Sequence, residues 1–311
     1  MKHLYVIGNG FDIFTGLKSR YSDFVVWMKK HYPFVYENLY DSYEMDGEWW
    51  NEFETNLGKL DVFHFINKFV NKNYFSDIHA KQNDNQQREE LKNIPPSFHV
   101  ENPCADRLAG LLDVLQYCFE KWALEIIGTI EVPQRVCLER NESFFINFNY
   151  TDTLQLLYKI PEDRVFHIHG RASKHEHLIF GHNQYHKDIK YDSPFVQLVC
   201  QELDNYYKDP FENCAKLKMD ISDAYFIHIY GFSFSSVDEG YLDWVISKTP
   251  QNSHWEISCF SEKDKERISS FVSKHPSLRD RCVLMKLKVI EKQETMGFPN
   301  NQKESDWFSK Q

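Results

Sequence analysis

Two glycines follow the first short apolar run of the chain, in the stretch VIGNGFDIFTGL, and helix-like spacing resumes directly after them. Gly8 and Gly10 carry no Cβ, so a ligand can approach the backbone there, and the start of the next helix offers unpaired N–H groups to an anion. The pattern fits a phosphate-binding turn. It fits equally a tight strand-to-helix turn in which Asp12 caps the helix. Ile13 replaces the third glycine of the dinucleotide-binding fingerprint, which argues against an ordinary dehydrogenase.

A second group of polar residues ends the apolar run in FFINFNYTDTL, residues 144–154. Asn147 and Asn149 are two positions apart, so their side chains lie on one face of a strand. Ligands of open α/β sheets bind beyond the carboxyl ends of the strands, and side chains placed there face that crevice. Thr151 or Asp152 could instead cap the following helix, but a cap does not account for the two asparagines.

A pair of histidines ends the next candidate strand, in RVFHIHGRAS. The strand alternation places His167 and His169 on one side. The ordinary histidine pKa of ~6.5 suits a general base at neutral pH, so we predict this role for His169, although a single histidine is more often a core residue. A metal site built from His167, His169 and His182 is an alternative without evident carboxylate ligands.

Small polar residues end a fourth strand, in FIHIYGFSFSSVDEG. Gly231 allows a close approach to the backbone, and the hydroxyls of Ser233 and Ser235 could reach a ribose or a phosphate. Ser235 or Ser236 could also cap the next helix, and both roles are compatible. We expect Gly10, Asn149, His169 and Ser233 to converge on a single cleft at one rim of a sheet.

The elements that position these residues alternate between strands and helices. Several strands are apolar on both parities, which is typical of strands covered on two faces, so we predict an α/β, Rossmann-like, mainly parallel sheet with helices on both faces. Strands are predicted at residues 4–7, 144–148, 165–168, 178–180, 225–230, 255–260 and 283–287. Helices are predicted at residues 21–31, 151–158, 195–217, 238–247 and 261–274.

The alternation stops after the first strand and helix. Residues 32–140 are predicted to form a helical insertion that contains a polar connection at residues 81–103, while 1–31 and 141–290 form the nucleotide-binding core and 291–311 a surface tail. The chain has 311 residues, a formal net charge of −10 and seven cysteines without a Cys-x-x-Cys pair. These features argue against a protein that coats nucleic acid, a disulfide framework and a tetrathiolate zinc site. Since no signal peptide or membrane span is evident, we expect a cytoplasmic protein.

The four polar strand ends resemble two related patterns. GNGFDIFTGL has the spacing of the sirtuin loop Gly-Ala-Gly-Ile-Ser-x-x-Ser-Gly-Ile, and NYTDTL, HIHG and YGFSF resemble the sirtuin segments Gln-Asn-Ile-Asp-x-Leu, His-Gly and Gly-Thr-Ser-Leu. More closely, IGNGFDIFTGLKSRYSDF, NFNYTDTL, HIHG and LIFGHN together resemble the bacteriophage abortive-infection AbiH family. The resemblance covers residues 1–30 and 143 to about 250, and little of the insertion.

The sirtuin resemblance implies a site for NAD, in which the glycine turn takes the pyrophosphate, Asn149 the nicotinamide ribose and His169 the position of the base. The cofactor contacts that we predict from the pattern are Gly8, Asn9, Gly10, Phe11, Asp12, Asp152, Gly231, Ser233 and Ser235. The four-cysteine zinc module of sirtuins is missing, which argues against a protein deacylase. Asp12 stands where the sirtuin loop has serine, and a carboxylate repels a pyrophosphate unless it caps the helix or orders a ribose.

The leading hypothesis from the sequence is an anti-phage abortive-infection protein that hydrolyses NAD, its substrate, to nicotinamide and ADP-ribose through an oxocarbenium-like state. Asn149 and His169 would be its catalytic residues. One alternative is a non-catalytic sensor that binds NAD or ADP-ribose and acts on a partner, and another is a metal-dependent nuclease or phosphohydrolase that uses the histidines and Asp12. Since constant loss of NAD would harm the host, we expect restraint by a homo-oligomer, by a regulatory partner or by the insertion.

Overall fold

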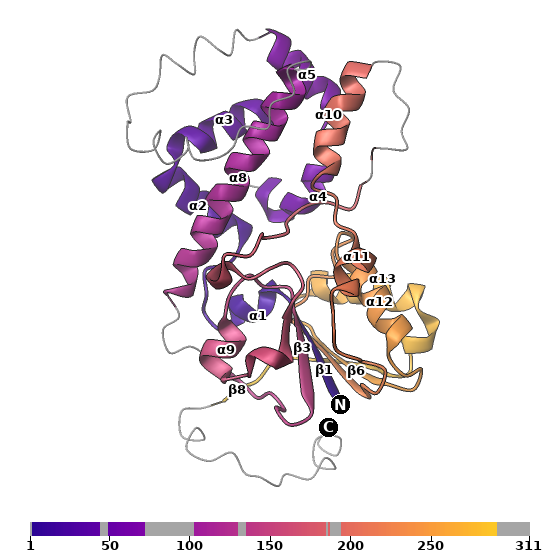
Figure 1. Cartoon of the computed structure of the whole chain (residues 1–311). Coiled ribbons are helices and arrows are strands. Elements are labelled where there is room, and N and C mark those ends of the chain that lie inside the picture. The colour runs from indigo at the N-terminus through magenta and orange to yellow at the C-terminus, as the bar shows by residue number, and fades with distance from the viewer. Residues whose placement is uncertain are drawn as a thin grey trace.

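A computed structural model of the chain describes residues 2–43, 49–71, 103–129, 135–184, 186 and 194–290. Its centre is a sheet of six strands in which every neighbouring pair is parallel (Figure 1). The strands are β1 (His3–Ile7), β3 (Ser143–Asn147), β4 (Val165–His167), β5 (Phe226–Tyr230), β6 (His254–Ser258) and β7 (Cys282–Met285). Their spatial order is β4-β3-β1-β5-β6-β7, which is the doubly wound order of a Rossmann-like fold. The predicted α/β class is confirmed.

Helices cover both faces of the sheet. On one face, Val6 and Ile229 pack against Leu242 of α12 (Glu239–Lys248) and Phe271 of α13 (Glu262–Lys274), near the short α11 (Pro210–Ala215). On the other face, Tyr5, Ile7 and Phe145 pack against α1 (Asn9–Phe14) and α9 (Thr153–Tyr158). Adjacent positions of one strand are thus buried on opposite sides, which is why these strands are apolar on both parities.

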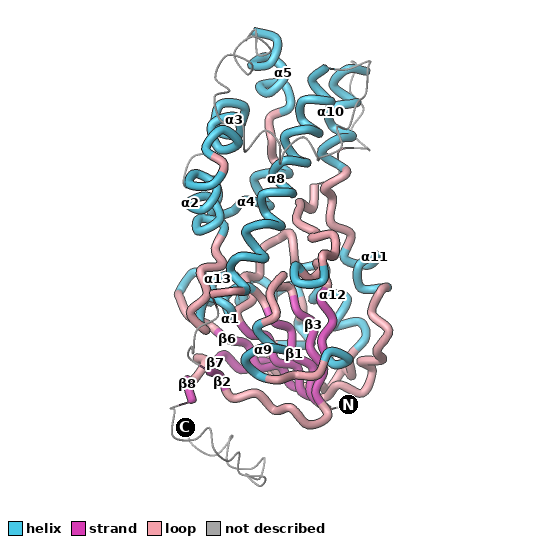
Figure 2. Tube along the Cα trace, turned by 60° about the vertical axis from the view of Figure 1, so that its left-hand side comes forward, coloured by secondary structure: helices cyan, strands magenta, loops and turns pink. Residues whose placement is uncertain are grey.

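A separate layer of helices lies beyond the carboxyl ends of the strands (Figures 1 and 2). Its apolar core is a single cluster that includes Phe24, Leu39, Phe53, Leu112 and Val199. The helices of this layer are α2 (Tyr21–His31), α3 (Pro33–Tyr43), α4 (Phe53–Gly58), α5 (Val62–Asn71), α8 (Pro103–Ile127) and α10 (Pro194–Asp204), with the short 3-10 helix η1 (Trp49–Glu52). The layer therefore draws α2 and α10 from outside residues 32–140.

Smaller elements complete the part of the chain that the structure describes. The strands β2 (Arg135–Val136) and β8 (Val289–Ile290) form an antiparallel pair apart from the main sheet. Single 3-10 turns are η2 (Glu162–Arg164), η3 (Ala172–Lys174) and η4 (Pro276–Leu278). The predicted tail at residues 291–311 and nearly all of the predicted polar connection at residues 81–103 lie outside the described residues.

Two predicted elements are wrong. Residues 178–180 form no strand, because Leu178 and Phe180 are buried in the core of the helical layer instead of in a ladder. The predicted helix at residues 195–217 is divided into α10 and α11, because Pro210 cannot continue a helix and the Asp209 side chain caps the new one by accepting from the amides of Phe211 and Glu212.

Candidate functional site

The turns after β1 and β5 are packed directly against each other. Gly10 N donates to Gly231 O at 2.8 Å and Gly8 N donates to Tyr230 O at 2.9 Å. A Cβ on Gly8 would lie 2.6 Å from Gly231 O, and one on Gly231, where φ is +64°, would lie 1.9 Å from Phe11 N. The glycines thus allow two backbone turns to touch. The amides of Gly8, Gly10 and Phe11 already donate to backbone carbonyls, so they are not directed at a phosphate here.

A cavity of about 380 Å³ lies between these turns and the helical layer. It sits where β1 and β5 are neighbours, which is the point at which the strand order reverses and at which doubly wound proteins bind ligands. Its volume falls within the range of small-molecule sites, roughly 300–1,000 Å³. The sequence-predicted residues that line it are Gly8, Asn9, Gly10, Asp12, Asn149, His169, Gly231, Ser233 and Ser235.

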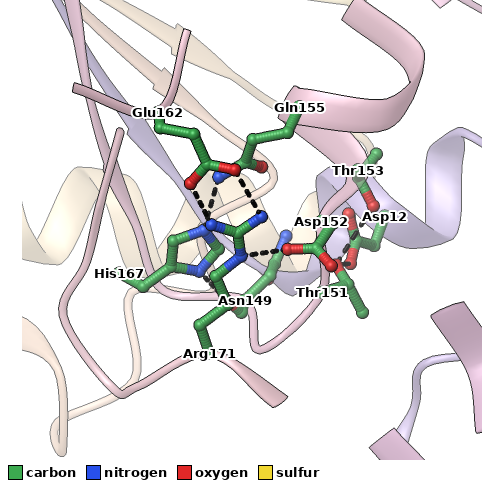
Figure 3. A network of polar contacts seen from close by, with 9 residues as sticks. All are labelled: Asp12, Asn149, Thr151, Asp152, Thr153, Gln155, Glu162, His167 and Arg171. Carbon is green, nitrogen blue, oxygen red and sulfur yellow. Dashed lines mark hydrogen bonds and ion pairs between the residues drawn. The ribbon is translucent and has the colours of Figure 1, made fainter. Parts of the chain in front are cut away.

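Two predicted contacts do not reach this cavity. Phe11 is fully buried under the sheet, where its ring lies 5.5 Å from that of Tyr158. Asp152 is buried and forms an ion pair with Arg171, which also binds Glu162 through both terminal nitrogens (Figure 3). Asp152 therefore holds the turn that carries Asn149 and does not line the cavity.

Asn149 and Asp12 line the cavity, and each has one buried side-chain oxygen that lacks a partner among the described residues. The Asn149 side chain donates through Nδ2 to Gly8 O at 3.2 Å, which fixes the amide orientation and leaves Oδ1 buried without a partner among the described residues. The Asp12 carboxylate accepts from Thr151 through Oδ2, and its Oδ1 likewise has no partner there (Figure 3). Burial raises the pKa of Asp12 to about 6. Side-chain hydrogen bonding by Thr151, Thr153 and Asn149 acts in the opposite direction and lowers this pKa.

His169 is 3% exposed and is enclosed by aromatic rings. The ring centroids of Phe148 and Tyr241 lie 5.1 Å and 5.4 Å from its own. Burial, together with the charge of Lys208, holds the pKa of His169 well below its usual range, so the ring is neutral. Its Nε2 lies 3.3 Å from Tyr241 Oη, and the ring also hydrogen-bonds the Phe148 carbonyl. His169 thus lines the cavity with both of its hydrogen-bonding groups engaged.

The other members of the two predicted pairs point elsewhere. Asn147 does not line the cavity, and its Oδ1 accepts from the backbone amide of Asn149 at 3.1 Å. His167 joins the network of Figure 3, where it donates through Nδ1 to the Asn149 carbonyl at 3.0 Å and contacts Gln155 Nε2 at 2.9 Å. Burial lowers the pKa of His167 to about 4, so it is a neutral support for the Asn149 backbone. Of the two histidines that the strand alternation was predicted to place on one side, only His169 lines the cavity.

No group of three metal-ligating side chains occurs within the described ranges of the chain. His182, the third member of the alternative metal site, is buried in a different place, with Nε2 2.8 Å from the Leu203 carbonyl. Nothing among these residues favours the metal-dependent alternative.

A buried ion-pair network in the cavity wall was missed by sequence reasoning. Lys208 Nζ lies 2.6 Å from Glu54 Oε1, which belongs to α4, and 3.6 Å from Asp238 Oδ1, which precedes α12. Burial lowers the pKa of Lys208, but the two carboxylates outweigh this effect, so its pKa is raised and the side chain stays charged. Pro210 is the signal that could have located Lys208. A proline ends a helix that precedes it, so Lys208, two residues before Pro210, is placed in a loop.

The fold and the cavity together define a class: an open, doubly wound α/β protein with a small-molecule-sized cavity at the switch point of its sheet. The chain belongs to the family described as bacteriophage abortive infection AbiH, whose model matches residues 4–259. No curated protein and no solved structure matches it. The AbiH resemblance is confirmed and indicates a role in abortive infection, whereas the sirtuin-like NAD site stays a prediction. None of the helices in the described residues has the length and apolar character that a membrane span needs.

Proposed function

We propose that this protein acts in abortive infection by hydrolysing NAD to nicotinamide and ADP-ribose. Water forms a new bond to C1′ of the nicotinamide ribose, and the bond between C1′ and the ring nitrogen breaks. Its electron pair neutralises the pyridinium, and the proton of the water passes to a base. Loss of the cofactor would stop an infected cell before the phage is released.

The observation that carries this proposal is that Asn149 and Asp12 line the cavity and that each has a buried oxygen without a partner in the part of the chain that the structure describes. A buried acceptor without a donor costs about 1–3 kcal/mol, so it is retained where a ligand or water completes it. Ribose hydroxyls and an attacking water are both donors. Asn149 would orient them, as the sirtuin resemblance implies.

The geometry favours Asp12 over His169 as the base. Both polar groups of the His169 ring are engaged with Tyr241 and Phe148, and its neutral form is the one that burial favours. Asp12 has an unpaired oxygen, and its pKa of about 6 leaves it ionised at neutral pH but basic enough to accept a proton. We therefore assign the base to Asp12 and a neutral wall of the nicotinamide pocket to His169.

The His169 ring is neutral and engaged in hydrogen bonds, so it does not accept a proton readily. This favours one competing function, a sensor that binds NAD or ADP-ribose without cleaving it. If no group in the cavity accepts a proton, the ligand would be held and not consumed. The two functions differ in their products, since only hydrolysis releases nicotinamide.

The test is incubation of the purified protein with NAD, with nicotinamide followed by chromatography. We expect release by the wild type and a decrease of about 100-fold or more in Asn149→Ala and in Asp12→Asn. The matched control is Asn252→Ala, an exposed position in the turn before β6, which should retain wild-type turnover. Tight binding of NAD in calorimetry without release over hours would support the sensor and reject the hydrolase.

A further inference from the structure

Trp50 belongs to η1 of the helical layer and is 1% exposed. Its indole stacks on Phe53 at 5.4 Å with an interplanar angle of 7°, and it meets Phe24 edge-on at 5.9 Å. Its Nε1–H has no hydrogen-bond partner among the described residues. By contrast, Trp27 donates to Glu125 at 2.7 Å and Trp255 donates to Ser253 at 3.0 Å.

An unpaired indole N–H in this place needs a physical reason. Leaving a buried donor without an acceptor destabilises a protein by about 1–3 kcal/mol, and buried tryptophans usually find a partner. Trp50 lines the same cavity as Asn149 and Asp12. Its Nε1 is covered by neighbouring atoms in the unliganded protein, so an acceptor atom of a bound molecule would complete its hydrogen bonding after a small shift of the indole.

The two sides of the cavity offer complementary groups. Among the described residues, the sheet side supplies two acceptors without partners, Asn149 Oδ1 and Asp12 Oδ1, while the helical side supplies the donor of Trp50. A ligand that satisfies all three carries hydroxyl donors in one part and an oxygen acceptor in another. A ribonucleotide has both, in its ribose hydroxyls and in its phosphate or carbonyl oxygens.

The segment that carries Trp50 is held in place by two ion pairs on the C-terminal side of the indole. Glu52 Oε1 lies 2.6 Å from Arg267 of α13, and Glu54 Oε1 lies 2.6 Å from Lys208. These pairs tie η1 and α4 to the sheet side of the molecule. The ion pairs thus keep the indole beside the cavity before a ligand arrives, which lowers the entropy cost of binding.

We propose that Trp50 is a ligand-recognition residue whose Nε1–H donates to an oxygen of the bound nucleotide, so that the helical layer forms one half of the binding site. The identity of the nucleotide rests on the proposed function. The hydrogen bond itself rests on the unpaired groups in the cavity.

The experiment compares Trp50→Phe, which removes the N–H and keeps an aromatic ring, with the wild type. ADP-ribose is titrated by calorimetry, and NAD is measured as Kd, or as KM if it is consumed. We expect binding weaker by about 3- to 10-fold. An effect on NAD alone assigns the acceptor to the nicotinamide carboxamide, and an effect on both ligands assigns it to the ADP-ribose part. The matched control is Trp49→Phe, a neighbour that does not line the cavity, which should bind as the wild type does.

A spectroscopic reading separates this hydrogen bond from a change in packing. The chain has seven tryptophans, and the indole N–H signal that Trp50→Phe removes identifies Trp50 in a proton–nitrogen correlation spectrum. Saturation with ADP-ribose should move that signal downfield and leave the signal of Trp255 in place. Saturated binding with an unmoved Trp50 signal, or with equal affinity in Trp50→Phe, overturns the inference and leaves the proposed function standing. Wild-type protein that binds neither nucleotide overturns both.

Discussion

Replacement of Asp12 by asparagine should make the unliganded protein more stable. The Asp12 side chain is 1% exposed, it has one unpaired oxygen, and no cation is among the groups that shift its pKa. Burial of its negative charge is therefore incompletely compensated. Asparagine can still accept from Thr151 through its amide oxygen, but it carries no charge to desolvate.

The magnitude follows from the raised pKa. Between the ordinary value of 3.8 and about 6, the folded protein keeps a proton that the unfolded chain has lost. Unfolding then releases a proton, so the free energy of unfolding falls as the pH rises, by about 1.4 kcal/mol per unit. The total loss in the free energy of unfolding caused by ionisation of Asp12 is about 3 kcal/mol, and it is reached above pH 6. Because the asparagine NH₂ also lacks a partner, we expect a gain of about 1–3 kcal/mol at pH 7.

The assay is urea unfolding of Asp12→Asn and wild type, followed by circular dichroism between pH 4 and pH 8. The gain should be absent near pH 4, grow up to about pH 6 and then stay constant. The control is Asp152→Asn, where loss of the buried pair with Arg171 should destabilise the protein by about 3–5 kcal/mol. The reasoning is refuted if Asp12→Asn is less stable at pH 7, or if its gain does not change with pH.

Two further substitutions test how the site is built. Gly231→Ala should lower the free energy of unfolding by about 3 kcal/mol or more in the same assay. The added Cβ would lie 1.9 Å from Phe11 N, and the backbone φ of +64° is unfavourable for alanine. A loss below about 1 kcal/mol would contradict this packing. Lys208→Met should cost about 3–5 kcal/mol by leaving the Glu54 carboxylate buried without its cation, and Glu54→Gln added to it should recover part of the loss. An equal loss in the single and double variants would show that the pair is not coupled.

The sequence predicts the sheet well because its signal is local. Val6 and Ile146 lie in short runs that are apolar on both parities, and such runs are typical of buried parallel strands. Local signals also misled. Leu178 and Phe180 alternate like a strand, but their burial comes from helices that are distant in the sequence. The strand alternation that paired His167 with His169 fails because β4 ends at His167 and the chain turns there.

The candidate site was predictable only on its sheet side. Asn149 and Gly231 follow strands directly, so their place at the carboxyl edge follows from topology. Trp50, Glu54 and Lys208 come from the helical layer and from a loop, and no pattern in the sequence indicates that these segments close over the sheet. Their contribution depends on packing between layers, which the spacing of residues in one segment does not record.

The helical layer is not an appendage that could be cut away. The chain enters this layer before β3 through α2 and again after β4 through α10. The core of the layer is therefore formed by segments that precede β3 and follow β4 in the sequence. Excision of residues 32–140 would strip the partners from Phe24 and Val199 and leave their apolar faces in water. A protein that lacks residues 32–140 should therefore aggregate. Separation of the helical layer from the sheet would also open the cavity, because residues of both line it.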